Sequence, residues 1–452
     1  MINESRYKLR FIHASDIHLG SVMHVSDMQS QGISSDYNTA VYDAFHKICN
    51  EAIRNSVDFI ILAGDVYDRE LRTVKASRAF YEESKLLEEH GIHIYLLKGN
   101  HDPIGENNEI FSMPENVHIF DCEKVQVFEI RKEGQLVGRI IGQSYRTKWE
   151  GKKIFKDYNI KDNDVYNIGV LHTGLESEKS NYIPCSLEEL KAVENINYWA
   201  LGHIHKRKVL HEEKPFIAYP GIPQGRDIGE EGIGGCYLVE VSEDFSEKVS
   251  YIKTSSFVWR KDVVNLEKDF HIKPSSLNEL EELLIQRGES IIGNTLSTQD
   301  INLPINYKQE DVKGIIIHWQ IEGRTEIDKI LREDYEAASY LKERLNNHFW
   351  RNNTQLHTEF IGINTLKEIP LYYLNSNNEV IDEMNDVLQA ISVDDKLKRE
   401  LTEAFGSVFE EYRDTEDINE EKLMLDEELI EEILRTSQDI IIEKFLEKGE
   451  YY

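Results

Sequence analysis

The sequence predicts an α/β protein of more than one domain, in which a sheet covered by helices carries the candidate functional site. Two observations lead to this prediction. The first hundred residues alternate strand and helix patterns, and polar side chains able to bind metals follow five predicted strands. Such alternation is typical of a parallel sheet covered by helices, and ligands bind at the carboxyl ends of strands in these sheets.

The first predicted unit has the order β-α-β-α-β. Apolar runs predict buried strands at Leu9–Ser15, Val57–Ala63 and Ile92–Leu97. Between them, apolar residues at helical spacing predict helices at Tyr37–Asn55 and Val74–Glu89. The three strands are therefore expected to be parallel, with their carboxyl ends at one edge.

Shorter β-rich runs follow Pro103 and predict mixed or antiparallel strands in the second half of the sheet. Ser186 and Glu189 have the spacing of a capping box, which predicts a short helix. We expect this first domain to end near residue 256. The predicted strands are 117–120, 125–130, 137–144, 166–171, 198–201, 216–219, 236–241 and 249–253.

The remaining sequence predicts two further parts, which fits the chain length of 452 residues. Residues 257–370 alternate helix and strand patterns without site-like turns, so they predict a small accessory α/β domain. The expected elements are helices at 276–287 and 334–349 and strands at 314–321 and 356–366. Residues 371–452 are expected to be helical, amphipathic and acidic.

The formal net charge of −31 counts against a nucleic-acid role, because acidic surfaces repel phosphate. The charge is uneven, however, since residues 371–452 hold 24 acids and 8 bases, a net of −16. Binding of DNA would need a local basic track. The densest basic group is Lys148, Lys152, Lys153, Lys156, Lys206, Arg207 and Lys208.

The cysteines and the hydropathy pattern indicate a cytoplasmic protein. Its four cysteines lie more than fifty residues apart and form no Cys-x-x-Cys pair, which argues against a cysteine zinc site or disulfides and for a reducing compartment. No run approaches the roughly 18 apolar residues of a membrane span. The polar N-terminus lacks the apolar core of a secretory signal, so we expect no membrane association.

Five strand ends deliver two carboxylates, one amide and five imidazoles. In an Asp-x-His or His-x-His pair on extended backbone, both side chains point to one face and can bind the same or neighbouring metals. This imidazole-rich set suits Mn, Fe, Zn or Ni better than Mg. A lone pair of this kind is more often surface or core, but five in chain order predict a metal centre. The residues are Asp16, His18, Asp65, Asn100, His101, His172, His203 and His205.

The order of these motifs resembles the calcineurin-like metallophosphoesterase family over residues 9–240. The resemblance rests on Asp-x-His at 16–18, Gly-Asp-x-x-Asp at 64–68, Gly-Asn-His-Asp at 99–102, a lone His172 and Gly-His-x-His at 202–205. It implies a two-sheet sandwich flanked by helices and a centre of two divalent metal ions. By position, Asp16, His18 and His205 would bind the first metal, Asp65 would bridge, and Asn100, His172 and His203 would bind the second.

The same resemblance implies that His101 is catalytic. It would protonate the leaving oxygen or stabilise charge on the phosphoryl group, and Asp102 would orient its ring.

A second stretch indicates the substrate. Tyr219–Arg226, which reads YPGIPQGR, is similar to a segment of SbcD-type DNA repair exonucleases, and its form is closest to the YhaO-type branch. This implies a DNA exonuclease or endonuclease, with Mn²⁺ as the preferred metal and Arg226 bound to a substrate phosphate. It also implies a homodimer, a capping domain at 257–370, and a C-terminal segment that docks on an SMC-like coiled-coil ATPase. The alternative interpretation is that residues 219–226 form only a turn between two strands.

Two alternatives stay open. The same metal site would serve a nucleotide or cyclic-nucleotide phosphodiesterase with a small substrate, which an acidic surface would trouble less. A scaffold that binds a partner through its acidic tail is the other alternative. The complete set of seven metal ligands disfavours a scaffold.

Overall fold

The structure is a computed structural model. It describes residues 7–26, 34–68, 73–104, 110–175, 182–270, 273–296, 312–334, 336–351 and 356–368, with scattered helical positions between Glu383 and Lys444. The predicted helical segment at 371–452 therefore lies almost wholly outside the described residues. Among the helices that are described, none is both long and apolar enough to cross a membrane.

The first sheet contains the predicted β-α-β-α-β unit. Its strand order is β12-β11-β1-β2-β3-β4, and β1 (Leu9–Ala14), β2 (Phe59–Ala63) and β3 (His93–Leu97) pair in parallel as expected. The short β4 (Val117–Ile119) continues the parallel order. At the other edge, β11 (Gly235–Val241) and β12 (Glu247–Lys253) are antiparallel.

Strands β5 to β10 form a second sheet and not the second half of the first, which corrects the expectation for these strands, whereas β11 and β12 belong to the first sheet. The order is β5-β6-β7-β8-β10-β9, and β6, β7, β8 and β10 are parallel neighbours. The bounds are β5 Gln126–Lys132, β6 Gln135–Gly142, β7 Tyr166–His172, β8 Tyr198–Gly202, β9 Lys208–His211 and β10 Phe216–Tyr219.

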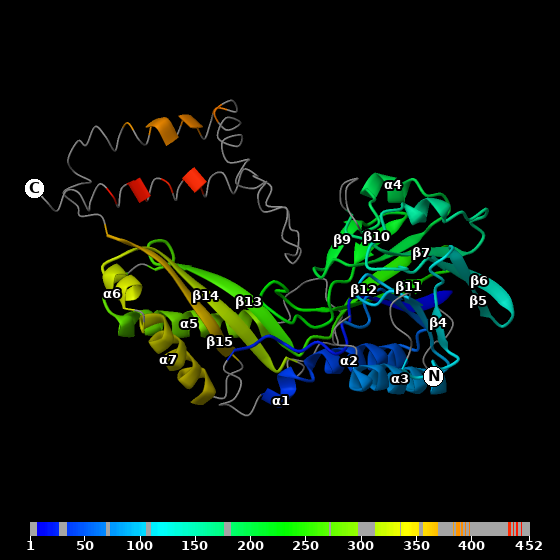
Figure 1. The fold of residues 1–452 in the computed structure, drawn as a ribbon, viewed down its shortest axis with the longest axis horizontal. Coiled ribbons are helices and arrows are strands. Elements are labelled where there is room, and N and C mark those ends of the chain that lie inside the picture. Colours follow the sequence, from blue (N-terminus) through cyan, green and yellow to red (C-terminus); the bar gives the residue numbers. More distant parts are fainter. Residues whose placement is uncertain are drawn as a thin grey trace, which may run out of the picture. The chain divides into compact units, whose positions relative to one another are not determined.

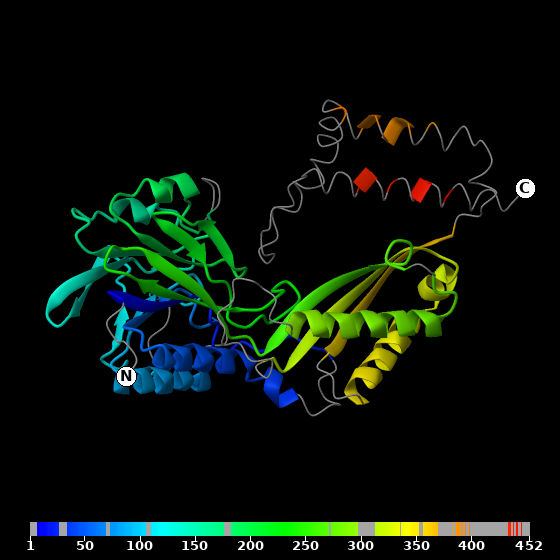
Figure 2. The ribbon, with the colours of Figure 1, turned by 180° about the vertical axis from the view of Figure 1, so that it is seen from behind.

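The two sheets pack face to face around an apolar core. Alternate strand residues such as Phe11 and Phe59 from the first sheet meet Tyr198 and Ala200 from the second. The other face of the first sheet is covered by α2 (Ala40–Arg54) and α3 (Val74–Glu89), which lie side by side in both views (Figures 1 and 2). This is the sandwich that the resemblance implies.

Local sequence explains where the helices begin. Thr73 caps α3 by accepting the backbone N–H of Ala76. The predicted capping box is present at α4 (Leu187–Lys191), where Ser186 and Glu189 each accept the other's backbone N–H. A four-residue helix, α1 (Ser34–Tyr37), precedes α2.

A third sheet has the order β13-β14-β15. Its strands are Phe257–Asn265, Gly314–Thr325 and Leu356–Lys367, and its helices are α5 (Leu277–Leu296), α6 (Asp328–Glu333) and α7 (Ala337–Arg351). The chain divides into two compact units. One contains the residues up to Asp262 with Leu284–His318 and Arg344–Phe360, and the other contains the remainder. The candidate site lies entirely in the first unit.

Candidate metal centre

The candidate centre lies where strands of both sheets end. Asp16 and Asp65 each come two residues after β1 and β2, and His172 is the last residue of β7. A hydrogen bond of 2.9 Å between His172 Nδ1 and the carbonyl oxygen of Ala63, the last residue of β2, joins the two sheets at this edge. The structure therefore brings ligand candidates from separate strands to one place, as strand-end chemistry requires.

The backbone at this edge is strained. Asp16, His18 and Asp65 have φ values of 54°, 50° and 52°, and His203 has a φ of 102°. Residues other than glycine rarely adopt these angles, and strain of this kind clusters at functional sites, where surrounding structure maintains it. The strain re-aims these side chains at the end of each strand.

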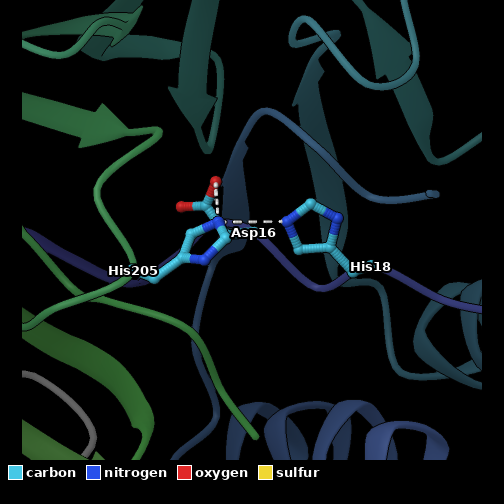
Figure 3. A group of neighbouring side chains, drawn as sticks. All are labelled: Asp16, His18 and His205. Carbon is cyan, nitrogen blue, oxygen red and sulfur yellow. Dashed lines mark hydrogen bonds and ion pairs between the residues drawn. The ribbon is translucent and has the colours of Figure 1, made fainter. Parts of the chain in front are cut away.

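Asp16, His18 and His205 form the first ligand group (Figure 3). His205 Nε2 lies 3.2 Å from His18 Nε2 and 3.9 Å from Asp16 Oδ1. Both oxygens of Asp16 also accept the backbone N–H of His203 at 3.1 Å, which fixes the carboxylate. These are the three residues that the sequence assigned to one metal.

Asp65, His172 and His203 form the second group. His172 Nε2 lies 3.2 Å from Asp65 Oδ2 and 2.9 Å from Asn100 Oδ1, and His203 Nδ1 lies 3.2 Å from the same amide oxygen. All four predicted members are thus together. Only glycine fits at position 64, because a Cβ on Gly64 would lie 2.1 Å from His172 Nδ1.

The donor set fits divalent cations. Imidazole nitrogens and carboxylate oxygens converge from several strands, and His18 Nδ1 is buried without a hydrogen-bond partner among the residues that the structure describes. The carbonyl oxygen of Ala63 binds Nδ1 of His172 and leaves Nε2 directed at the ligand group, which is the usual outer-shell arrangement of metal-binding histidines. Transition-metal ions such as Mn, Fe, Zn or Ni match these donors.

Electrostatics keeps the carboxylate of Asp65 ionised in the second group. Burial opposes a charge on Asp65, but the neighbouring His172 outweighs it and holds the pKa of the carboxyl well below its usual value. Burial likewise opposes a charge on His172, but Asp65 raises the pKa of its ring to about 9. In His203 burial dominates and lowers the pKa to about 3, so this ring is neutral and able to donate a lone pair.

His101 lies beside both ligand groups, but its ring has a different partner from the one predicted. His101 Nδ1 is 3.7 Å from Asp68 Oδ1, and the two residues form a third cluster with His18. Asp102 instead accepts the backbone N–H groups of Gly99 and Val66 and is buried. In the structure the carboxylate beside the His101 ring is thus that of Asp68, whereas the carboxylate of Asp102, which was expected to orient this ring, binds backbone N–H groups of two neighbouring turns.

Arg226 lies in the site but is bound by acidic side chains. Its Nη2 is 2.6 Å from Glu230 Oε1, and its Nη1 is 3.6 Å from Asp68 and 3.4 Å from Ser21. Glu230 Oε1 in turn accepts His205 Nδ1 at 2.8 Å, leaving Nε2 for the first ligand group. A substrate phosphate would have to compete with these contacts, so positioning of Glu230 explains the guanidinium better than phosphate binding.

The sequence reasoning missed Asp68 and Glu230. Asp68 stands on the same turn as Asp65 within the Gly-Asp-x-x-Asp motif, so its spacing was a usable signal. Glu230 carries no comparable signal, because only the folded loop between β10 and β11 brings it to His205.

Comparison with known proteins identifies this arrangement. Residues 9–207 match the model of the calcineurin-like phosphoesterase family. This part of the chain is a calcineurin-like metallophosphoesterase domain. The resemblance inferred from the motifs is thereby confirmed, and the phosphoesterase domain contains every residue of the two ligand groups.

The relatives of the phosphoesterase domain include a metallophosphoesterase and DNA double-strand break repair proteins. The chain is 34% identical over 261 residues to the metallophosphoesterase YhaO of Bacillus subtilis, covering 57% of this chain and 63% of YhaO. It is 22% identical over 298 residues to the DNA double-strand break repair protein Mre11 of Archaeoglobus fulgidus, covering 62% and 65%. Mre11 of Methanocaldococcus jannaschii is 27% identical over 248 residues, covering 52% and 63%. The matched region spans less than two thirds of each relative.

Glu230→Ala is expected to weaken cation binding at the first ligand group by about 10–100-fold, as loss of outer-shell partners does. His205 would lose the carboxylate that fixes its ring and its tautomer. Isothermal titration of the purified variant with Mn²⁺ measures this directly. Glu231→Ala is the matched control, because Glu231 is the exposed neighbour of Glu230 and its carboxylate accepts the backbone N–H of Lys261. Equal affinities in both variants would contradict the role of Glu230.

Proposed function

We propose that this chain is a two-metal phosphodiesterase that cleaves the backbone of nucleic acid, with DNA as its substrate, as an exonuclease or endonuclease in DNA repair or processing. The observation that carries this proposal is the convergence of two adjacent ligand groups with His101 at their side. The names of the Mre11 relatives, which are DNA double-strand break repair proteins, support the choice of DNA.

The side chains have separate tasks in this proposal. Asp16, His18 and His205 would hold one divalent cation, and Asn100, His172 and His203 would hold a second, with Asp65 near both groups. The chemistry that two divalent cations, with Mn²⁺ preferred, would supply here is polarisation of a phosphoryl oxygen of the substrate and a lower pKa for a water molecule. Glu230 and Ala63 keep the rings of His205 and His172 in position.

As the oxygen of a water molecule bonds to phosphorus and the bond from phosphorus to the sugar oxygen breaks, the protonated His101 ring would donate its proton to that leaving oxygen. Asp68 orients this ring through Nδ1, so that Nε2 faces the substrate.

The assembly is part of the same proposal. Family resemblance implies a cytoplasmic homodimer that acts with an SMC-like coiled-coil ATPase, with residues 257–370 as a capping domain. The acidic segment 371–452 would dock on a basic helical surface of that partner.

Cleavage of end-labelled linear DNA in the presence of Mn²⁺ tests the function. The wild-type protein is expected to release nucleotides or cut internally, and His101→Ala is expected to leave the DNA intact. Product lengths over time then separate exonuclease from endonuclease action. Intact DNA with the wild-type protein would overturn the nuclease proposal.

The net charge of −31 favours a second candidate, a phosphodiesterase of nucleotides or cyclic nucleotides. Small substrates need no long basic track. Rapid hydrolysis of a cyclic nucleotide by protein that leaves DNA intact would establish this alternative.

A further inference from the structure

A series of aromatic rings leads away from the second ligand group toward solvent. The ring of Tyr182 lies 4.7 Å from the ring of His203, and the ring of Trp149 lies 5.3 Å from that of Tyr182. Both distances are typical of aromatic contacts. Lys148 Nζ lies 4.9 Å above the Trp149 ring. We call Tyr182 and Trp149 the aromatic platform.

Backbone hydrogen bonds hold the platform in place. Glu150 and Tyr182 form a parallel β-bridge, and the N–H of Ile183 donates to the carbonyl of Glu150. On the other side, Thr147 Oγ1 donates to the carbonyl of Trp149 at 2.9 Å. The two rings therefore belong to backbone segments that are hydrogen-bonded to each other.

Trp149 is half exposed, with 50% of its surface accessible, whereas Trp199, Trp259 and Trp319 are fully buried. An exposed large aromatic side chain forgoes the free energy of burial, and it is informative when it adjoins a site. Here the accessible ring continues a contact path that begins at a proposed metal ligand. Half of the Trp149 surface is thus accessible to a group that extends out of the centre, and a base that stacks on it would displace the Lys148 side chain from the ring toward the adjoining phosphate.

The chemistry of the platform matches a nucleobase followed by phosphate. Aromatic faces stack on any base, and nearby lysines attract the backbone, which is how proteins bind single strands without sequence preference. Lys148 supplies a cation at the ring, and the exposed Lys152 lies three residues beyond Trp149. In a duplex, base faces are covered by their neighbours, so only an unpaired base can stack here.

We propose that Tyr182 and Trp149 stack an unpaired nucleobase next to the phosphodiester that occupies the metal centre. The substrate is then a single strand or a frayed end, and intact duplex is a poor substrate. This inference rests on the proposed function of the centre. It names which form of nucleic acid that centre accepts.

A comparison of normal and abasic oligonucleotides tests the platform. The substrates are a single-stranded oligonucleotide and the same strand with abasic sugars flanking the cleaved bond, which keep the backbone charge. Wild-type protein is expected to prefer the normal strand by about 10–100-fold in kcat/KM, the range for one stacked base. Trp149→Ala is expected to cleave both strands at the lower, abasic rate, mainly through a higher KM.

Two variants control this experiment. Trp149→Phe keeps an aromatic face and should retain most of the preference. Tyr340→Ala removes another exposed aromatic ring, on α7, and should behave as wild type. An unchanged preference in Trp149→Ala would overturn the platform, as would equal cleavage of both strands by the wild-type protein.

Fluorescence separates failure of the platform from failure of the nuclease proposal. Titration with a mononucleotide or an uncleaved oligonucleotide should quench emission in the wild type and leave Trp149→Phe largely unquenched. Quenching by an oligonucleotide without cleavage would support the platform while the nuclease proposal fails. Quenching by mononucleotides alone would overturn the assignment of a strand as substrate. Cleavage without a base preference would overturn the platform and leave the nuclease proposal standing.

Discussion

Asp65→Asn is expected to reduce hydrolysis of phosphodiesters by more than about 100-fold, since loss of even an outer-shell partner costs about 10–100-fold. Asp65 is fully buried, with Oδ2 3.2 Å from His172 Nε2 and Oδ1 accepting the N–H of His101. Asparagine keeps the size and one acceptor oxygen, so the fold is expected to persist. What is lost is the negative charge that a cation shared between the two groups requires.

Thermal unfolding with and without Mn²⁺ provides a readout independent of activity. A cation that binds only the folded chain stabilises it, by about 2.7 kcal/mol at a hundred times its Kd. The melting temperature of the wild type should therefore rise on adding Mn²⁺, and that of Asp65→Asn should rise much less.

Asp58→Asn is the matched control for this experiment. Asp58 immediately precedes β2, whereas Asp65 follows its other end, and Asp58 contacts Lys132 and the backbone N–H of Arg10. This variant should keep both the metal-dependent shift and the activity. A full shift and full activity in Asp65→Asn would contradict the assignment of Asp65 as a shared ligand.

The sequence allowed the secondary structure of the first sheet to be predicted closely, because its signals are local. Strands β1, β2 and β3 are short apolar runs buried on both faces, and α3 occupies the predicted residues 74–89. Edge strands were harder. β9 (Lys208–His211) was missed because it has only two apolar residues, Val209 and Leu210, and none of its four residues is buried.

Tertiary contacts decided the elements that were misplaced. The helix expected at 276–287 continues as α5 to Leu296, because Gly288 does not end it. A Cβ at Gly288 would lie 2.5 Å from the Phe349 ring on α7, so glycine is needed there for close packing. Similarly, the shift in composition at residue 257 coincides with a strand, β13 (Phe257–Asn265). The close approach of Gly288 to Phe349 is not visible in a linear sequence pattern.

The grouping of the candidate ligands at one edge was predictable for a physical reason that does not extend to their supporting partners. Ligands follow strands directly, so that order and spacing along the chain reveal them. Glu230 reaches His205 only through a folded loop, and Arg226 is held by Glu230 and Asp68. Sequence adjacency also misled, since Asp102 follows His101 but binds the backbone of its own turn. Supporting contacts depend on three-dimensional proximity.

His101→Ala is expected to lower hydrolysis by about 10²–10⁴-fold, the usual contribution of a positioned proton donor. The loss should depend on the leaving group. An ester with a nitrophenol leaving group needs little protonation, whereas a sugar or alkyl oxygen needs much. The factor by which His101→Ala slows hydrolysis should therefore be at least about tenfold larger for the alkyl ester than for the nitrophenyl ester. Equal losses would indicate that His101 stabilises charge or structure and does not donate a proton.

A double-mutant cycle tests whether Asp68 acts through His101. Asp68→Asn removes the carboxylate 3.7 Å from His101 Nδ1 and is expected to cost about 10–100-fold. If Asp68 only positions the ring, the double variant should be no slower than His101→Ala alone, because residues that act as a unit are not additive. Additive losses would show a separate role, for which the proximity of Asp68 to His18 and Arg226 offers a structural basis.

Asp102→Asn serves as the comparison. Since Asp102 binds Gly99 and Val66, it should lower the melting temperature and leave the leaving-group dependence unchanged.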